Sequence, residues 1–161
     1  DNISVGSQAH VQNAGWQNKV TDGNISGTVG QSLRLEAIKL NVENQDCSGT
    51  IKYEAHVQNI GWQSAVTSGG IAGTTGKALR IEAINISLTR ELANRYDVYY
   101  RVHAQNYGWM NWAKNGENAG TVGKALRLEG IQVVLVKKGL VAPDNSYGGV
   151  ITNNNFAYID K

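Results

Sequence analysis

AHVQNIGWQSAVTSGGIAGTTGKALRIEAINISL, residues 55–88, decides the fold of this chain, because near-copies of the stretch occur twice more. Residues 9–42 read AHVQNAGWQNKVTDGNISGTVGQSLRLEAIKLNV, and residues 102–135 read VHAQNYGWMNWAKNGENAGTVGKALRLEGIQVVL. The tryptophans at positions 16, 62 and 109 are 46 and 47 residues apart, and the aligned histidines and arginines keep the same spacing. A fixed period of this kind indicates a repeat architecture.

Each unit has the pattern of β structure. In residues 51–58, apolar Tyr53, Ala55 and Val57 alternate with polar residues, which is typical of a half-buried strand. Each unit closes with a longer strand in which the apolar residues change parity, and this change predicts either a β-bulge or a switch of packing partner. Two long and two short strands per unit, about twelve in all, are expected. Tight turns are predicted between them, at Asp22-Gly23, Ser68-Gly69 and Asn115-Gly116.

Three such units cannot each bury a core alone, so we expect them to close around a pseudo-threefold axis into one all-β domain over residues 1–161. The expected units are about 3–46, 47–93 and 94–140, followed by a non-repeat tail, 141–161. A β-trefoil is favoured because the outer strands of each unit look longer, and a β-prism is the alternative. The tail is expected either to add a closing strand or to act as a linker.

Composition excludes several classes of function. The 15 basic and 13 acidic residues are scattered and give a net charge of +2, so no nucleic-acid partner is expected. No apolar run approaches the roughly 20 residues that cross a bilayer, so no membrane insertion is expected. Cys47 is the only cysteine, which excludes an internal disulfide framework and a cysteine metal cage.

A recurring set of His, Gln, Asn and Trp side chains is the leading candidate for ligand binding. Saccharide hydroxyls pair with planar amides and imidazoles, and sugar-binding sites commonly have an aromatic wall. The competing interpretation is that the tryptophans pack in the core while His and Gln satisfy backbone groups. The candidate binding residues are His10, Gln12, Asn13, Trp16, His56, Gln58, Asn59, Trp62, His103, Gln105, Asn106, Tyr107, Trp109 and Trp112.

The third unit differs from the others in having two extra aromatic residues, Tyr107 and Trp112. Together with Trp109 they would form a stacking platform, so this unit is predicted to be the strongest single ligand site. The alternative is that these rings pack beneath Phe156 and Tyr158 of the tail. Of the four indoles, Trp112 is expected to be the most accessible to a fluorescence quencher.

Neither catalysis nor a metal site is expected. Arg34 and Glu36, with their counterparts Arg80 and Glu82, and Arg127 and Glu129, lie two apart on one strand face and predict a structural ion pair or a clamp between units. The alternative is a direct ligand role for the arginines. A neighbouring Arg keeps a carboxyl ionised, which is the wrong state for the proton donor of a glycosidase. The three histidines could reach zinc only by converging on the axis, since no unit supplies a ligand pair of its own. No cofactor is expected.

The strings H-V-Q-N-x-G-W, G-T-x-G and L-R-L-E-A/G-I resemble the clostridial hydrophobic repeat with a characteristic Trp, the ChW repeat, over roughly residues 3–136. The resemblance implies an extracellular module, secreted or attached to the surface of Gram-positive bacteria, with a binding role. The third unit departs from the pattern at Ala104, Met110 and Trp112.

We therefore expect a non-catalytic, lectin-like module that binds carbohydrate of a cell wall or extracellular polysaccharide. Up to three weak, equivalent sites would gain strength from simultaneous engagement. The competing class is a protein-interaction or adhesion module that tethers a surface enzyme or another partner protein. An exposed apolar patch would favour protein docking, whereas a polar hollow beside a tryptophan would favour sugar.

Overall fold

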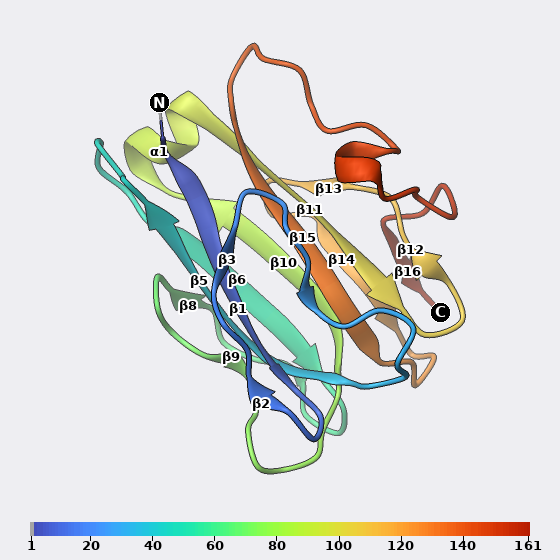
Figure 1. The fold of residues 1–161 in the computed structure, drawn as a ribbon. Coiled ribbons are helices and arrows are strands. Elements are labelled where there is room, and N and C mark those ends of the chain that lie inside the picture. The colour runs from blue at the N-terminus through green and yellow to red at the C-terminus, as the bar shows by residue number, and fades with distance from the viewer. Residues whose placement is uncertain (1) are drawn as a thin grey trace.

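The computed structural model describes residues 2–161 and is nearly all β, with three sheets built on three long hairpins (Figure 1). Each repeat supplies one hairpin, which confirms the all-β fold and its three units. Within residues 2–161 the strands form three separate sheets and no closed barrel. The preference for a β-trefoil over a β-prism stays a prediction. The hairpins are β1 (Ser4–Val11) with β5 (Leu35–Glu43), β6 (Ile51–Val57) with β10 (Ile81–Leu88), and β11 (Tyr96–Ala104) with β15 (Leu128–Lys137).

Each unit has three short strands between its long ones, where the sequence predicted two. The first two short strands both pair with the same edge of the first long strand, and their two-residue ladders leave no alternating pattern to read. A six-residue helix, α1 (Arg90–Arg95), and a short 3-10 turn, η1 (Tyr147–Gly149), were not predicted either, because both are too short to show a helical period. The short strands are β2 (Gly15–Trp16), β3 (Val20–Thr21), β4 (Ser26–Gly27), β7 (Gly61–Trp62), β8 (Val66–Thr67), β9 (Ala72–Gly73), β12 (Gly108–Trp109), β13 (Ala113–Lys114) and β14 (Asn118–Val122).

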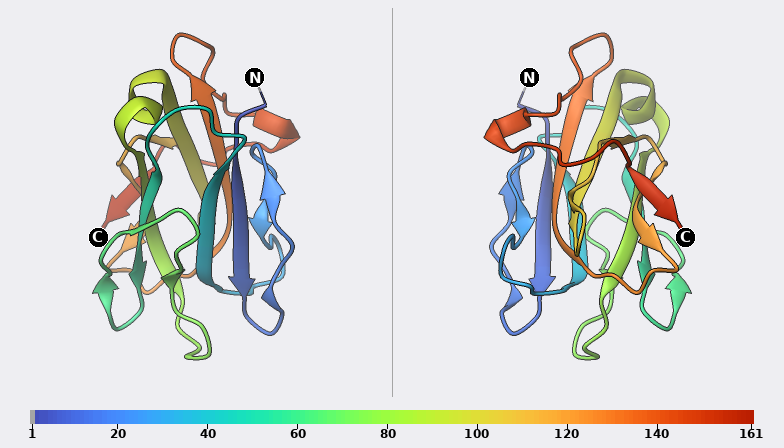
Figure 2. Two further views of the ribbon diagram at one scale, coloured as in Figure 1. Left: turned by 90° about the vertical axis from the view of Figure 1, so that its left-hand side faces the viewer. Right: turned by 90° about the vertical axis from the view of Figure 1, so that its right-hand side faces the viewer.

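The third short strand of every unit leaves its own sheet and pairs with another unit. Strand β4 of unit one pairs with β15 of unit three, β9 of unit two pairs with β5 of unit one, and β14 of unit three pairs with β10 of unit two. Every unit thus both donates and receives one strand, and the three exchanges form a closed cycle. The side views in Figure 2 show the long strands standing side by side as a consequence.

The turn before each exchanged strand also bonds to the neighbouring unit. The backbone N–H groups of Gly23, Gly69 and Gly116 donate to Val133 O (3.0 Å), Leu40 O (2.8 Å) and Ile86 O (2.7 Å). All three glycines have positive φ angles of 77°, 82° and 88°, as the predicted tight turns require. The turn signals read from the sequence are confirmed, and their role is to fasten one unit to the next.

The predicted bulge is present in each long hairpin. The ladder slips between the aligned positions of His10 and Val11, and again in units two and three, which leaves the unpaired residue at Glu36, Glu82 or Glu129. The extra residue at the bulge shifts the alternation by one position. The apolar residues after the bulge therefore stay on the inner face of the sheet, although their parity in the sequence changes.

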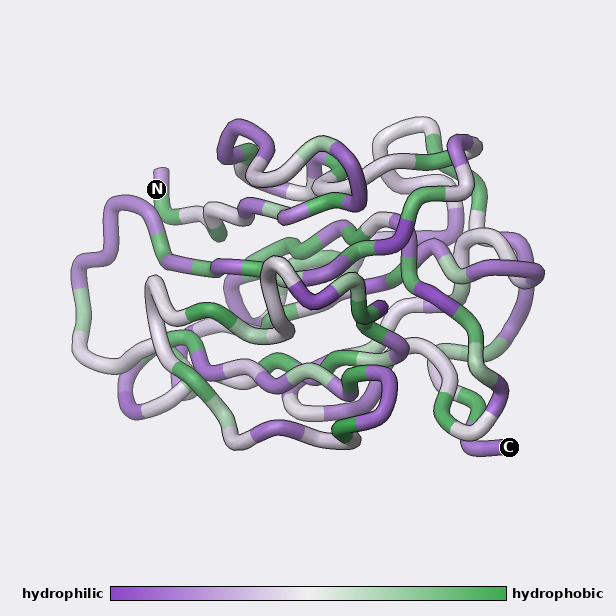
Figure 3. Tube along the Cα trace, turned by 90° about the horizontal axis from the view of Figure 1, so that it is seen from below, coloured by the Kyte–Doolittle hydropathy of each residue, from purple (hydrophilic) through white to green (hydrophobic). Residues whose placement is uncertain are grey.

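One hydrophobic cluster draws on the inner faces of all six long strands. Tyr53, Ala55 and Val57 are fully buried and alternate with more exposed residues, as their spacing predicted. Figure 3 shows the same alternation of hydrophobic and hydrophilic residues along the central strands. The units therefore share a core that none encloses alone.

The tail adds a strand, β16 (Tyr158–Asp160), which pairs in parallel with β14 at the edge of the second sheet. Its position explains why unit three departs from the repeat at Met110. In units one and two the aligned Gln17 and Gln63 hydrogen-bond both the N–H and the C=O of the exchanged glycine. Met110 cannot do so, and Gly120 N–H donates instead to Ala157 O of the tail at 2.9 Å.

Within residues 2–161, no helix combines the length and the apolar composition needed to cross a membrane.

Gly73→Ala tests the strand exchange. Gly73 has φ +96°, and an added Cβ would lie 2.3 Å from Glu36 O of the neighbouring unit. We expect a loss of about 2–4 kcal/mol in the free energy of unfolding, measured by urea denaturation. The matched control is Gly76→Ala, three residues further on, where φ is +72° and nothing lies within 4 Å. It should cost only about 1 kcal/mol. Equal losses for the two variants would contradict a close inter-unit approach at Gly73.

Candidate functional site

A buried glutamate organises the polar residues of each unit. Glu36 is 5% exposed, and its carboxylate contacts His10 Nδ1 at 2.9 Å and Arg34 Nε at 2.7 Å. Glu82 and Glu129 repeat both contacts in their own units. A buried carboxylate is stable only when its oxygens are paired, and here each has a partner. The predicted Arg–Glu ion pair is thereby confirmed, with a histidine added to it.

The histidine in turn positions the repeat tryptophan. Strand register places His10 opposite Trp16, and the two rings meet edge to face with centroids 5.2 Å apart. The corresponding pairs in units two and three are 5.3 and 5.4 Å apart. Because directly opposite residues lie on the same sheet face, each indole and its imidazole lie together on the outer surface.

The repeat glutamines and asparagines lie apart from the tryptophans. Gln12 Oε1 accepts a hydrogen bond from the Arg34 backbone N–H, and Gln58 and Gln105 make the equivalent bonds. These three glutamines line one shared pocket together with the repeat arginines. Asn13, Asn59 and Asn106 are exposed turn residues with φ between 66° and 71°. The recurring set is therefore divided between an outer face, a common pocket and a turn.

A cross-strand pair beside the tryptophan makes the three outer faces different. The aligned pairs are Gln8 with Lys39, Glu54 with Asn85, and Arg101 with Gln132. In unit one, Lys39 Nζ lies 4.3 Å from the centroid of the Trp16 ring, a distance typical of a cation–π contact. One side of the Trp16 indole is thereby occupied.

In unit three the tail covers the tryptophan. Arg101 is fully buried and donates to Gln132 Oε1 (2.7 Å), to Thr152 Oγ1 (2.5 Å) and to Val150 O (2.9 Å). Its guanidinium lies 5.3 Å from the Trp109 ring, whose side chain is left only 5% exposed. Burial lowers the pKa of Arg101, while the Asp144 carboxylate acts in the opposite direction. Arg101 thus helps to fasten the tail over this face, together with Asn153, whose Oδ1 accepts the Trp109 backbone N–H at 2.7 Å.

Tyr107 and Trp112 also contact the tail. Asn154 Nδ2 donates to Tyr107 O at 3.1 Å, and Trp112 Nε1 donates to Asp144 O at 2.9 Å. The Trp112 ring also meets Tyr147 edge to face, with centroids 5.6 Å apart. The rings expected to contact Trp112 were Phe156 and Tyr158, but Tyr147 takes that place and Phe156 is 52% exposed. A ligand site on Tyr107, Trp109 and Trp112 stays a prediction. Trp112 was expected to be the most accessible indole, but it is only half-buried, whereas Trp62 is exposed.

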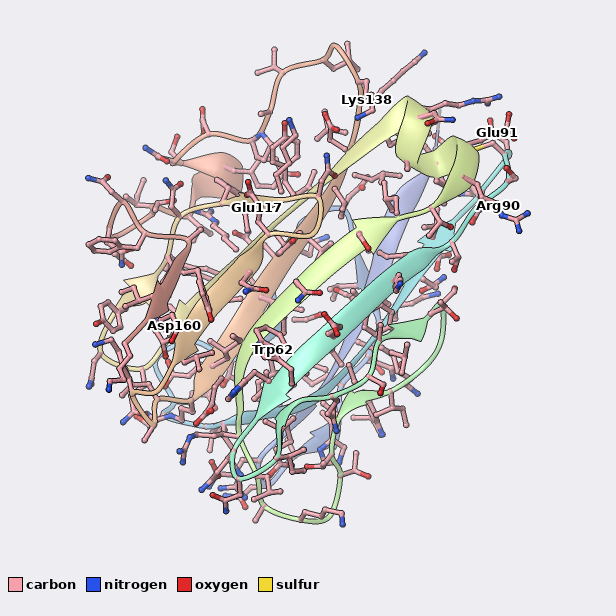
Figure 4. The ribbon with its side chains drawn as sticks, turned by 180° about the vertical axis from the view of Figure 1, so that it is seen from behind. Trp62, Arg90, Glu91, Glu117, Lys138 and Asp160 are labelled. Atoms are coloured by element: carbon pink, nitrogen blue, oxygen red, sulfur yellow. The ribbon has the colours of Figure 1, made fainter. Side chains whose placement is uncertain are left out.

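Unit two presents the most open arrangement, which we call the unit-two face and define as Glu54, His56, Trp62 and Asn85. Trp62 is 37% exposed, and within residues 2–161 no Lys or Arg side chain lies over its ring. Glu54 and His56 alternate with the buried residues of β6, so both point outward with Trp62. Figure 4 views this side of the molecule and labels Trp62.

The Asn85 edge of this face continues toward the tail strand. Asn85 Nδ2 donates to Asn118 Oδ1 at 2.9 Å across the exchanged strand β14. Burial and the Asp160 carboxylate raise the pKa of Tyr158, whereas a hydrogen bond with Asn118 lowers it. Polar side chains of unit two, of unit three and of the tail therefore lie along this edge of the unit-two face.

Sequence reasoning missed Arg101, Glu54 and Asn85. The repeat alignment contained the signal, because Gln8, Glu54 and Arg101 occupy one aligned position with three different charges. The shared residues do not distinguish the three outer faces from one another, whereas the residues that vary do. Within residues 2–161, no group of three or more His, Cys, Asp and Glu side chains is placed to hold a metal ion.

Arg101→Met tests the covering of unit three. The substitution keeps an apolar stem but leaves Thr152 and two tail carbonyls without their donor. We expect a loss of about 2–4 kcal/mol in unfolding free energy, with stronger acrylamide quenching of tryptophan fluorescence. Arg95→Met, which removes an exposed partner of Glu91, should change stability by less than about 0.5 kcal/mol. Unchanged quenching in Arg101→Met would mean that the tail is held by other contacts.

The comparisons with known proteins agree with this division into three units. A family model described as ChW, Clostridial hydrophobic W, matches residues 10–44, 56–90 and 103–137. No curated protein and no solved structure is similar enough to count as a match. The matched segments make up more than half of the chain and begin at the three histidines of the outer faces. The chain therefore belongs to the ChW family and carries three tandem copies of its repeat.

Proposed function

We propose that this chain is a non-catalytic, extracellular module that binds carbohydrate through its outer sheet faces, with the unit-two face as the principal site. The observation that carries the proposal is the Trp62 ring, which is 37% exposed and has no cation over it within residues 2–161. An open indole is suited to the C–H face of a sugar ring. The membership in the ChW family supports a repeat module of this kind.

The polar groups beside Trp62 have the chemistry that sugar hydroxyls require. Glu54 makes no side-chain hydrogen bond to another protein group within residues 2–161, so its carboxylate is free to accept hydrogen bonds from two sugar hydroxyls. His56 Nδ1 is already bound to Glu82, which leaves Nε2 as its second hydrogen-bonding atom. Asn85 retains its amide oxygen as an acceptor. One aromatic wall and three polar groups are a typical set for a small polar ligand.

The three outer faces would not contribute equally to carbohydrate binding. Lys39 occupies one side of the Trp16 ring, so the unit-one face favours a saccharide that tolerates or pairs with a cation. The unit-three face is covered by Arg101 and the tail. We propose two working faces, with different chemistries, on one rigid body. A long polysaccharide could engage both and gain affinity by effective concentration.

No catalytic role is proposed, because the repeat carboxylates serve the scaffold. Glu36, Glu82 and Glu129 are 5–6% exposed, and both oxygens of each are bound to Arg or His. Carboxylates held in this way stabilise the positions of neighbouring groups. They have no free oxygen for a substrate.

A second candidate function is docking of a partner protein, and the tail region favours it. Val141 is 91% exposed and Leu140 67% exposed, with Ile151 (59%) and Phe156 (52%) also uncovered. Exposed apolar residues concentrated in one part of a chain are typical of interaction surfaces. Carbohydrate binding and protein docking would use different residues. The double substitution Leu140→Ser with Val141→Ser should therefore abolish binding of a partner protein and leave polysaccharide binding unchanged.

Trp62→Ala tests the carbohydrate proposal in pull-down assays with peptidoglycan and with plant polysaccharides. We expect the variant to lose about tenfold or more in affinity, since an aromatic contact and its buried area contribute about 1–3 kcal/mol. Ile71→Ala is the control, because Ile71 is 48% exposed in the same unit but outside the unit-two face. Its affinity should stay within about twofold of the parent.

A second substitution separates stacking from hydrogen bonding. Glu54→Ala should weaken binding of the same polysaccharide by about tenfold, because a charged acceptor contributes about 1.5–3 kcal/mol. Absence of binding to both classes of polysaccharide by the unmodified chain would refute the proposal. Equal losses for Trp62→Ala and Ile71→Ala would do the same.

A further inference from the structure

A polar pocket of about 370 Å³ lies where the three units meet, away from the outer faces. Its lining comes from aligned positions of all three repeats, which places it on the pseudo-threefold axis. Ser32 and Ala78 contribute to the lining, and the other six residues are three glutamines and three arginines. These six are Gln12, Arg34, Gln58, Arg80, Gln105 and Arg127. Among residues 2–161, no Asp or Glu lines it.

The hydrogen bonds of this ring leave donors facing the pocket. Each glutamine uses its Oε1 to accept the backbone N–H of the arginine in its own unit, at 3.0, 3.3 and 3.2 Å. This bond fixes the amide orientation, and the Nε2 groups make no hydrogen bond to the protein within residues 2–161. The terminal nitrogens of Arg34 and Arg80 are likewise without a protein acceptor there, because only Nε is bound to the glutamate.

Charge and backbone geometry agree with this arrangement of donors. The glutamates that neutralise the arginines are 5–6% exposed, whereas the arginine side chains are 22–24% exposed, so the guanidiniums face the pocket. Lys77 directly precedes Ala78, which lines the pocket, and Lys124 directly precedes the aligned Ala125, so two of the three units carry a lysine next to this position in the sequence. Ser32, Ala78 and Ala125 all have φ of 56–57°, a conformation that non-glycine residues rarely adopt and that is concentrated at binding sites.

We propose that this axial pocket binds one compact polyanion per chain, through carboxylate or phosphate oxygens held by the three guanidiniums and three carboxamides. Planar guanidinium groups match both kinds of oxyanion with paired N–H donors. A pocket that offers donors and no side-chain carboxylate discriminates against neutral sugars, so this site differs in chemistry and place from the unit-two face. The proposal stands independently of carbohydrate binding.

Isothermal titration calorimetry of the whole chain with citrate and with tripolyphosphate tests the proposal, in a low-salt buffer without small multivalent anions. We expect one site per chain and an affinity that falls as salt is added. Tighter binding of citrate would identify carboxylate as the natural group, and tighter binding of tripolyphosphate would identify phosphate. Failure of both probes to bind at about 10 mM would overturn the proposal.

The discriminating variant is Gln58→Glu combined with Gln105→Glu. A glutamate oxygen can still accept the arginine backbone N–H, so the fold is retained, but two donors become negative charges. We expect the affinity for the better probe to fall by about tenfold or more. Lys52→Gln with Lys137→Gln changes the net charge by the same amount at exposed positions outside the pocket and should change affinity by less than about twofold. Equal losses in the two double variants would contradict a built axial site.

An NMR titration of the unmodified chain tests the same site without relying on a variant that could misfold. In an NMR titration with the better probe, the largest shifts should appear at the Arg80 and Gln58 side chains, with none at the Trp62 indole. Shifts that appear instead at the outer faces would refute the axial assignment.

Discussion

Three buried carboxylates, those of Glu36, Glu82 and Glu129, hold the parts of this molecule in register. Each occupies the bulge of a long hairpin, where one residue has no partner on the opposite strand. Its oxygens bind a histidine on one side and an arginine on the other. The histidine positions the outer tryptophan, and the arginine faces the axial pocket. Removing such a carboxylate would leave buried polar groups unpaired, so its cost is expected to exceed that of an exposed ion pair.

The same bulge is where the units join. Thr28 N–H donates to Glu129 O and Thr74 N–H to Glu36 O, both at 2.9 Å, so the side chain of the glutamate serves its own unit and its carbonyl serves the next. Glycine is required on the incoming strand because a Cβ at Gly27, Gly73 or Gly120 would come within 2.3–2.5 Å of the glutamate carbonyl. Inner packing, outer face and axial pocket are therefore consequences of one local geometry repeated three times.

The sequence predicted the features that depend on local pattern. Alternation in residues such as Tyr53, Ala55 and Val57 indicated the long strands, and Asp22-Gly23 and its counterparts indicated the turns. Strand exchange could not be predicted, because a two-residue strand such as Ala72–Gly73 pairs according to space and not to its own pattern. The three repeat glutamines were expected beside the tryptophans but line the axial pocket. Repetition in a sequence shows that a residue is retained in every unit, but it does not show which surface that residue faces.

The candidate site was predicted in part. Trp62 and His56 lie together as expected, whereas Trp109 is covered by a tail that Arg101 and Asn153 hydrogen-bond to unit three. Packing of the tail over unit three was anticipated as one alternative, but no repeat pattern describes the tail, so its contacts were assigned to Phe156 and Tyr158 where Tyr147 meets Trp112. The loss of glutamine at Met110 was visible in the sequence, but its meaning required the position of Ala157.

Interlocking of the three units is the central claim, and native-state hydrogen exchange measures it most directly. The amides of Thr28 and Thr74 bond across unit boundaries, whereas the Gln12 and Gln58 amides bond within a unit, to Arg34 O and Arg80 O. If the units form one interlocked body, both kinds of amide exchange only by global unfolding, with the same free energy and the same dependence on denaturant. Faster exchange at Thr28 and Thr74 than at Gln12 and Gln58 would show units that separate independently, and would contradict the account.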